Sequence, residues 1–331
     1  MGFGWVWAAC RCASLLRAGH AVAARLKLTA LTVLSAFILG DLSVSPAQAE
    51  PKKKTSQSSE ALSIPEVPSD DIFGFTSPTD VGNVGDLGFA NENDGRAGKR
   101  NGHYRALDSK FEFSSTPAKD WWVAGSFFAA WDRIRDVTGL DDGSTSSVDG
   151  ISFEIERLLI RRSASNPFAV SLSVEPRWSR IDPISGLRST AYNAQFKIFV
   201  DAVVVPDKLY WAANVYFTPQ RAQDITDRSN WQDTSSTLLS TALTFQLSQS
   251  LFVGAEARHM TSYSGVWLND RMGYAVYIGP TLAWRITDKI VFNTTWQPQV
   301  SGRSSINPGL RFDLDNFERA QFRLKLAVQL N

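Results

Sequence analysis

The segment Phe168-Ala-Val-Ser-Leu-Ser-Val-Glu-Pro-Arg-Trp-Ser-Arg180 alternates apolar and polar residues. Successive side chains of a β-strand point to opposite faces, so this segment predicts a strand with one apolar face and one polar face. Strands of soluble sandwiches alternate in the same way, and one such strand therefore does not decide the fold. The pattern recurs up to the last residue, however, and an export signal precedes it.

The N-terminal region is typical of a secretory signal peptide. Basic residues precede the apolar run Leu28–Gly40, and Ala47-Gln48-Ala49 forms an A-x-A cleavage site before Glu50. The apolar run is too short to cross a bilayer comfortably as a helix, which makes an uncleaved anchor the weaker alternative. Both cysteines fall within the predicted signal peptide, residues 1–49, so the predicted mature chain does not depend on disulfide bonds.

The next region, residues 50–80, is rich in Lys, Ser, Pro and Asp and lacks apolar periodicity. This composition predicts a flexible periplasmic tail, with a plug or docking role as the alternative. The whole chain carries 34 basic and 33 acidic residues. Such a balance does not indicate a nucleic-acid-binding protein, and we expect no nucleic-acid partner.

In residues 81–331, strand-like segments occur in pairs joined by short turns. The pairs are 106–115 with 121–132, 151–161 with 168–180, 192–205 with 209–220, 238–247 with 251–260, and 274–286 with 290–300. A last strand covers 318–330. The longer polar loops between the pairs are 136–150, 182–189, 221–234, 262–273 and 302–316. Tight turns at one end and longer loops at the other are typical of outer-membrane barrels, whose periplasmic turns are short.

The odd number of strands counted so far indicates that one more strand is present. The five pairs and the last strand make an odd total, whereas bacterial single-chain barrels have even strand numbers. We therefore expect a glycine-rich strand at residues 81–92, followed by a loop at 93–101. The sequence thus predicts an all-β fold, a transmembrane antiparallel up-and-down β-barrel of about twelve strands, in residues 81–331.

Alternation assigns the two faces of each strand. In the last strand, Leu324 and Leu326 are predicted to face lipid, while Arg323 and Lys325 face the lumen. Aromatic residues gather near both predicted ends of the strands, as expected for two interfacial girdles.

One segment, 151–161, fits the alternation poorly because Arg157 shares a parity with Ile155 and Leu159. A β-bulge near Arg157 would re-aim the chain. Alternatively, Arg157 extends along the surface to the nearby membrane interface.

The polar faces carry acids and bases that are candidates for lining the lumen. The candidate pore-lining residues are Lys110, Glu112, Glu154, Glu156, Glu175, Arg177, Lys197, Asp201, Glu256, Arg258, Arg285, Arg323 and Lys325. In a water-filled lumen such charges set ion selectivity. In the alternative, they pair across neighbouring strands and fill a narrow barrel. The near balance of signs argues against strong selectivity for either cations or anions.

From residue 81 to 331 the chain resembles Gram-negative outer-membrane β-barrels, and it is broadly similar to 12-stranded porin-like and small-molecule transport barrels. The signal peptide, the series of hairpins and the last strand carry this resemblance. The sequence Phe322-Arg-Leu-Lys-Leu-Ala-Val-Gln-Leu330 resembles the signal that the barrel-assembly machinery recognises. The resemblance implies Sec-type export to the outer membrane and contact with outer-membrane lipid, small solutes and, during biogenesis, that machinery. It implies neither a particular solute nor an oligomeric state.

Three functions follow from these observations. The first is a passive pore or uptake channel for small solutes, and the second is a lumen-closed barrel that acts structurally or through its loops. The third is a lipid hydrolase, because Asn91-Glu-Asn-Asp94 is faintly similar to the first-strand acid and amide residues of outer-membrane lipid A deacylases, with His103 as candidate base. No nucleophile is placed beside His103 by spacing, so we expect no enzyme and no catalytic residue. We also expect no cofactor or metal, because no ligand spacing or nucleotide fingerprint occurs.

Overall fold

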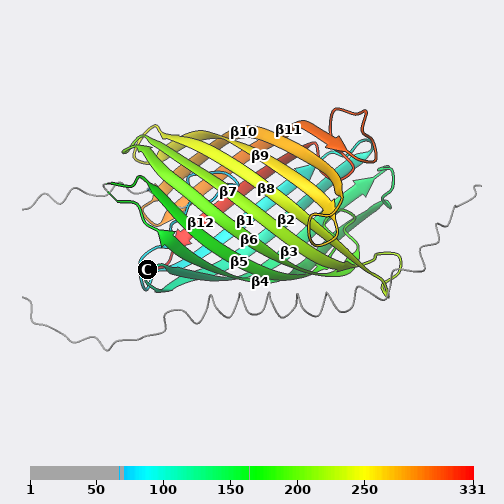
Figure 1. Cartoon of the computed structure of the whole chain (residues 1–331), viewed down its shortest axis with the longest axis horizontal. Helices are drawn as coiled ribbons and strands as arrows, with labels where there is room; N and C mark the ends of the chain where they lie inside the picture. The colour runs from blue at the N-terminus through cyan, green and yellow to red at the C-terminus, as the bar shows by residue number, and fades with distance from the viewer. Residues whose placement is uncertain (1–66, 68–70, 164) are drawn as a thin grey trace, which may run out of the picture. The chain divides into compact units, whose positions relative to one another are not determined.

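The computed structural model describes residues 67, 71–163 and 165–331. Its strands form a closed antiparallel barrel in which each strand pairs with its sequence neighbours and β1 pairs with β12 (Figure 1). The strands are β1 Leu87–Ala97, β2 His103–Ala118, β3 Trp121–Arg135, β4 Gly143–Ile160, β5 Phe168–Ile181, β6 Arg188–Val205, β7 Leu209–Gln223, β8 Trp231–Gln246, β9 Leu251–Ser264, β10 Arg271–Thr287, β11 Ile290–Ser304 and β12 Ala320–Gln329. The all-β fold and the strand number predicted from the sequence are confirmed.

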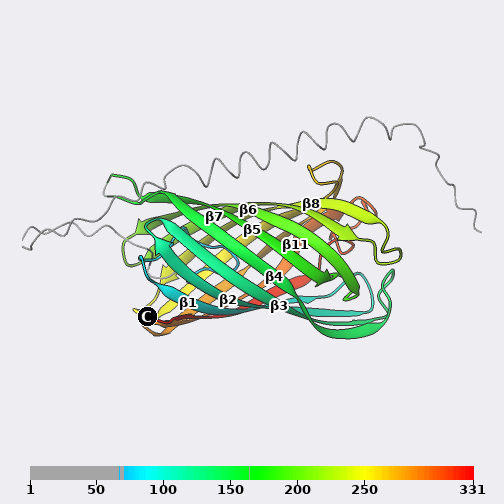
Figure 2. The same ribbon diagram turned by 90° about the horizontal axis from the view of Figure 1, so that it is seen from below.

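The strands are tilted against the long axis of the barrel (Figure 2), as closure of a sheet into a barrel requires. Closure also leaves no open sheet edge, so the backbone groups of every strand find partners within the wall. The described residues contain no helix that is long and apolar enough to cross a membrane.

The first strand differs from its prediction. β1 covers Leu87–Ala97 and not residues 81–92, and the segment 93–97, expected to be a loop, pairs with both β2 and β12. The polar residues that suggested a loop have partners inside the barrel: Asp94 bonds Arg323, and Arg96 bonds Asp108. Asp94 and Arg96 therefore belong to the lumen face of β1 and not to a loop.

Most connections at one end of the barrel are shorter than those at the other end; the exception is 161–167. The turn end holds the connections 119–120, 161–167, 206–208, 247–250 and 288–289, and the loop end holds 98–102, 136–142, 182–187, 224–230, 265–270 and 305–319. Asp120 and Asp207 have positive φ angles of 67° and 56° in their turns, a conformation that aspartate tolerates better than most residues. Several loops are shorter than expected because the strands continue further, as β4 does through 143–150.

The chain termini of the barrel meet at the turn end. The backbone N–H of Leu330 donates to the carbonyl of Leu87, and the side chain of Asn331 bonds to the N–H of Leu87 and to the carbonyl of Gly85. The C-terminus accordingly lies at the end with the tight turns (Figure 1). These bonds complete the seam between β1 and β12.

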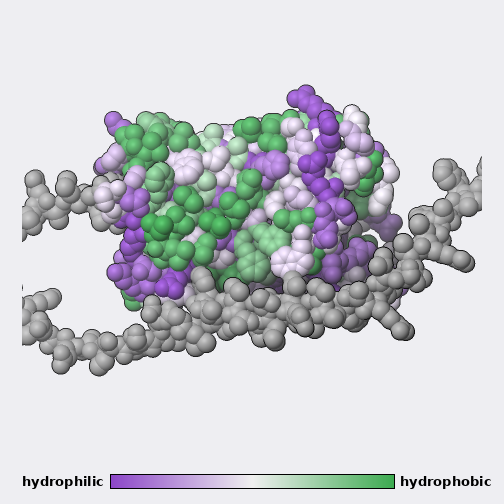
Figure 3. All heavy atoms as spheres, in the orientation of Figure 1, coloured by the Kyte–Doolittle hydropathy of each residue, from purple (hydrophilic) through white to green (hydrophobic). Residues whose placement is uncertain are grey.

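Large apolar side chains cover much of the outer face of the barrel, and hydrophilic residues gather mainly toward its ends (Figure 3). Leu324 and Leu326 are 42% and 39% exposed on this face, whereas Arg323 and Lys325 form ion pairs in the lumen. The predicted faces of the last strand are thus confirmed. Exposure of this much apolar surface suits a lipid environment and not water.

The position of Arg157 combines parts of both alternatives. Its guanidinium lies over the ring of Trp121, 4.9 Å from the centroid, near the turn end and on the outer side. The β4–β5 register shifts just beyond it, between Leu158 and Ile160. Arg157 therefore stays on the outer face, and the irregularity follows it by one residue.

The predicted tail is wrong for its last part. Residues 71–80, expected to be flexible in the periplasm, lie against the inner wall of the barrel, where Ile72 and Phe73 are each 1% exposed. They lack apolar periodicity because the wall surrounds them, so no single face of this segment is buried. The predicted signal peptide, residues 1–49, and the tail residues 50–66 lie outside the described residues and stay predictions.

Candidate functional site

The lumen contains a stretch of the chain that precedes β1, residues 71–81, which we call the inner segment. Asn293 of β11 donates hydrogen bonds to the carbonyl groups of Asp71 (2.8 Å) and Phe73. Asn214 of β7 accepts from the N–H of Ser77 (2.8 Å) and donates to its carbonyl (2.7 Å). Alternate residues of an extended chain face the same side. The wall thus holds the backbone of the inner segment at every second residue.

Two buried carboxylates continue this pattern. Glu256 accepts hydrogen bonds from the N–H of Phe75 (2.8 Å) and the hydroxyl of Thr76 (2.5 Å). Asp201 accepts from the N–H and the hydroxyl of Thr79, both at 2.7 Å. Burial of a carboxylate is strongly unfavourable unless hydrogen bonds compensate it. Glu256 and Asp201, predicted as pore-lining residues, therefore serve to hold the inner segment.

Apolar and aromatic contacts fix the same segment from its other side. The guanidinium groups of Arg258 and Arg323 lie 3.5 Å and 4.4 Å from the centroid of the Phe75 ring, a cation–π arrangement. Ile72 and Phe73 pack into an apolar cluster near the turn end. The other members of this cluster are Val67, Val203, Tyr210, Ala212, Ala242, Phe252 and Ala283.

The space beside the inner segment is one cavity of about 910 Å³, which we call the lane. Its wall comes mostly from β1 to β6 and β12, and the inner segment closes its remaining side. The lane reaches residues of the turn end, such as Lys289 and Gln329, and residues of the loop end, such as Asp182 and Gln220. It therefore extends along the length of the barrel.

Lysines and glutamates pair across strands in the lane. The ammonium of Lys197 lies 2.9 Å from Glu154 and 2.5 Å from Glu175, which joins β6 to β4 and β5. Lys110 of β2 lies 2.6 Å from Glu112 and 3.8 Å from Glu175. Lys197 and Glu175 pair across neighbouring strands, as in the predicted alternative, whereas Lys110 and Glu112 are on the same strand and the other two pairs join strands that are not neighbours.

A second group of charges lies where β12, β1 and the inner segment meet. Arg323 bonds Asp94 (2.7 Å) and Glu92 (2.8 Å), and Lys325 bonds Asp71 of the inner segment (2.6 Å). The two basic residues therefore connect the seam of the barrel to the segment inside it.

The remaining predicted residues also lie on the inner side. Glu156 accepts a hydrogen bond from Ser171 (2.6 Å). Arg177 bonds Asp149 (2.5 Å) and covers the ring of Phe128, and Arg285 lies near the turn end. All predicted pore-lining residues except Asp201 and Glu256 line the lane. Whether the lane conducts stays a prediction.

Sequence reasoning missed several lane residues, including Asp94, Arg96 and Asp149. All three fell into predicted loops, at 93–101 and 136–150. Their polarity hid the alternation, since neighbouring outward residues such as Gly95 and Ser146 are small or polar. These residues could have been found by continuing the alternation of inward and outward positions beyond the last apolar residue of each strand.

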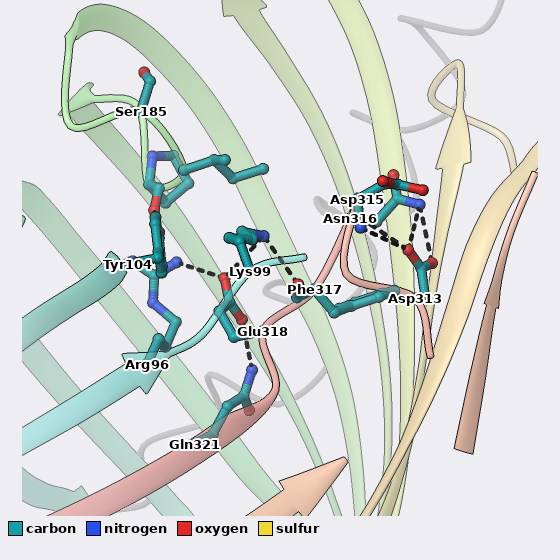
Figure 4. A network of polar contacts seen from close by, with 12 residues as sticks. Arg96, Lys99, Tyr104, Ser185, Asp313, Asp315, Asn316, Phe317, Glu318 and Gln321 are labelled. Carbon is teal, nitrogen blue, oxygen red and sulfur yellow. Dashed lines mark hydrogen bonds and ion pairs between the residues drawn. The ribbon is translucent and has the colours of Figure 1, made fainter. Parts of the chain in front are cut away.

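At the loop end, the loop 305–319 folds against the β1–β2 connection (Figure 4). Lys99 donates to the carbonyl of Phe317 (2.9 Å) and lies 3.6 Å from the carboxylate of Glu318, and Arg96 lies 3.3 Å from the same carboxylate. Burial opposes ionisation of Glu318, but the two positive charges outweigh it and hold the pKa of this carboxyl below its ordinary value. The ion pairs thus fasten the loop beside the mouth of the lane.

The residues of the hydrolase hypothesis do not meet in the structure. Asn91 and Asn93 lie on the outer face of β1, whereas Glu92 and Asp94 point into the lumen. His103 is exposed at the loop end. It lies six residues along β2 from Ser109, the partner of Asn93, and six residues of an extended strand span about 20 Å. Within the described part of the chain, no group of three or more histidine and acidic side chains is arranged to hold a metal ion.

A closed antiparallel barrel with an apolar outer face and a polar lumen defines the class: this is an integral outer-membrane β-barrel protein. Within that class, the chain belongs to DUF6662, a family of unknown function whose model matches residues 65–330. No curated protein matches the sequence.

Solved structures that are similar to this chain include the COG4313 outer membrane channel from Pseudomonas putida F1. It is 12% identical with a TM-score of 0.55, and the match covers 76% of this chain and 98% of that one. The KdgM porin in complex with disordered oligogalacturonate is 10% identical with a TM-score of 0.42, covering 74% and 99%. The deltaS2 mutant of the TodX monoaromatic hydrocarbon channel is 9% identical with a TM-score of 0.36, covering 76% and 91%.

Proposed function

We propose that this protein is a passive outer-membrane channel through which small polar solutes pass along the lane. The observation that carries the proposal is a single cavity that touches residues of both barrel ends and is lined by charged and polar side chains. A barrel that served only as a scaffold would need no such continuous space. The fold shared with an outer membrane channel supports the same function.

The inner segment would determine what the channel admits. It occupies the side of the lumen along β6 to β11 and leaves the lane along β12 and β1 to β6. Large solutes are therefore excluded. Acidic and basic groups alternate along the lane, so an ion of either sign finds partners there, and we expect weak selectivity.

The second candidate, a lumen-closed barrel that acts through its outer surface or loops, is favoured by the inner segment and by the fastened loop 305–319. The two candidates differ in one measurable property. Purified protein in a planar bilayer gives discrete single-channel currents if the lane conducts, and none if the lumen is closed. Absence of current from folded, heat-modifiable protein would overturn the channel proposal in favour of the second candidate.

Replacement of one lane charge tests the path of the ions. Lys110→Gln removes a positive charge beside Glu112 and Glu175, so the reversal potential in a salt gradient should move toward cation selectivity. Arg133→Gln is the matched control, because Arg133 is exposed and lies outside the lane. Equal shifts in both variants would mean that ions do not pass Lys110.

A further inference from the structure

Two carboxamides lie on the lipid-facing side of β1. In the sheet, Asn91 is opposite Leu326 and Asn93 is opposite Leu324, and both leucines are exposed on the outer face. On the other side, the neighbour of Asn93 is Ser109 of β2, whose side chain also points outward. A polar patch of Asn91, Asn93 and Ser109 thus interrupts an apolar surface.

Aromatic residues show that this patch lies within the apolar band. Toward the turn end, the next outward residue of β1 is Phe89, whose ring contacts that of Phe113 with centroids 5.1 Å apart. Toward the loop end, the next is Gly95, which the ring of Phe322 covers. Aromatic girdles mark the two edges of the band in outer-membrane barrels. The patch between these rings is therefore surrounded by hydrocarbon and out of reach of water-soluble partners.

The patch satisfies only part of its hydrogen-bonding capacity. The hydroxyl of Ser109 donates to Asn93 Oδ1 (2.7 Å), Asn93 Nδ2 donates to Asn91 Oδ1 (2.7 Å), and Asn91 Nδ2 donates to the carbonyl of Lys110 (3.3 Å). A carboxamide has two N–H donors, and each asparagine uses one of them among the described residues. One N–H of each amide thus remains on a surface where lipid tails offer no acceptor.

We propose that this patch is the contact surface of a homodimer within the membrane, with β1 and β2 of one protomer against β1 and β2 of its partner. A two-fold contact places the same patch on both sides, so the surface must complement itself. Carboxamides meet this requirement because each carries both a donor and an acceptor. The small outward residue Ala129, which is next to Ser109 in the sheet, leaves room for close approach of the two walls. The inference does not depend on whether the lane conducts.

The oligomeric state of the full-length protein in lipid nanodiscs, read by native mass spectrometry, tests the proposal. We expect dimers for the parent and an at least tenfold higher dissociation constant for the double variant Asn91→Leu, Asn93→Leu. The matched control is Thr237→Leu, Thr241→Leu on the outer face of β8, which should leave the dimer intact. Heat modifiability on a gel verifies that each variant is folded. A monomeric parent, or a dimer that survives the asparagine replacements, would overturn the proposal.

A second variant keeps the test decisive if the double leucine variant does not fold. In a chain with Cys10 and Cys12 changed to serine, Asn93→Cys should form a disulfide-linked dimer in outer membranes upon oxidation, because the two-fold contact brings the same position together. Thr237→Cys in the same background should not. Folded Asn93→Cys barrels that stay monomeric on oxidation would contradict the proposed surface.

Discussion

Lys325 and Leu326 are adjacent residues of β12 whose side chains enter different environments. The ammonium of Lys325 contacts Asp71 in the lumen, and Leu326 is exposed to lipid. Arginine at a lipid-facing position near the midplane of a barrel costs about 2–4 kcal/mol. We therefore expect Leu326→Arg to reduce the folded, heat-modifiable form far more than Lys325→Leu does, measured by gel shift during a urea titration. Equal losses of folded protein in the two variants would mean that the assignment of the inward and outward faces of β12 is wrong by one residue.

Glu318 makes the loop 305–319 sensitive to acid. Its pKa is lowered in the folded protein, so its stabilising contribution is complete above the ordinary value of about 4.3 and disappears as the pH falls through the lower folded value. We expect faster hydrogen exchange of residues 305–319 at pH 3 than at pH 7, after correction for the intrinsic rates. In Glu318→Gln this additional acid effect should vanish. Identical protection of the parent at both pH values would show that Glu318 does not fasten the loop.

Among the elements, those with apolar outward residues could be predicted, and the others could not. The predicted strand 168–180 forms β5, Phe168–Ile181, because apolar residues alternate from Phe168 to Trp178 and face outward. The end of β1 and the start of β4 carry small or polar residues on their outward positions, so their alternation is invisible in hydropathy. The inner segment shows no apolar periodicity in the sequence that could have predicted its position. Its order comes from Asn214, Asn293 and two carboxylates far away in the sequence.

The inner segment should be displaceable when its carboxylate anchors are weakened. Asp201→Asn together with Glu256→Gln replaces charge-assisted hydrogen bonds by weaker neutral ones. We expect this variant to show larger single-channel conductance or frequent large openings, since the segment then vacates part of the lumen. The measurement is a planar-bilayer recording beside the parent.

A disulfide provides the control for this prediction. The hydroxyl oxygens of Thr76 and Ser240 lie 2.9 Å apart, so cysteines at these two positions are within bonding reach. Adding Thr76→Cys and Ser240→Cys to the weakened variant should restore the parental conductance when oxidised, and dithiothreitol should abolish this restoration. Unchanged conductance in the presence and absence of the disulfide would mean that the segment does not limit the current.

The molecule as a whole has an orientation that the loops and turns predict. Short turns face the periplasm in outer-membrane barrels, so the loops holding Asp142 and Ser229 should face the medium. A protease-sensitive tag at either position should be cleaved on intact cells, whereas a tag in Pro206–Lys208 should be cleaved only after permeabilisation. The reverse result would show that the loops face the periplasm and that the predicted orientation is wrong.

The contacts of the inner segment also limit when this segment can dock during folding. Thr79 bonds Asp201, 122 residues later in the chain, and Asp71 bonds Asn293, 222 residues later. Contacts between such distant residues form slowly, because a long loop must close before they are gained. The segment leaves the ribosome before any strand of the wall, and yet its partners on β11 arrive near the end of synthesis. The inner segment can therefore dock fully only after β11 has been made. A chain that stops before β11 would leave this segment without its partner Asn293.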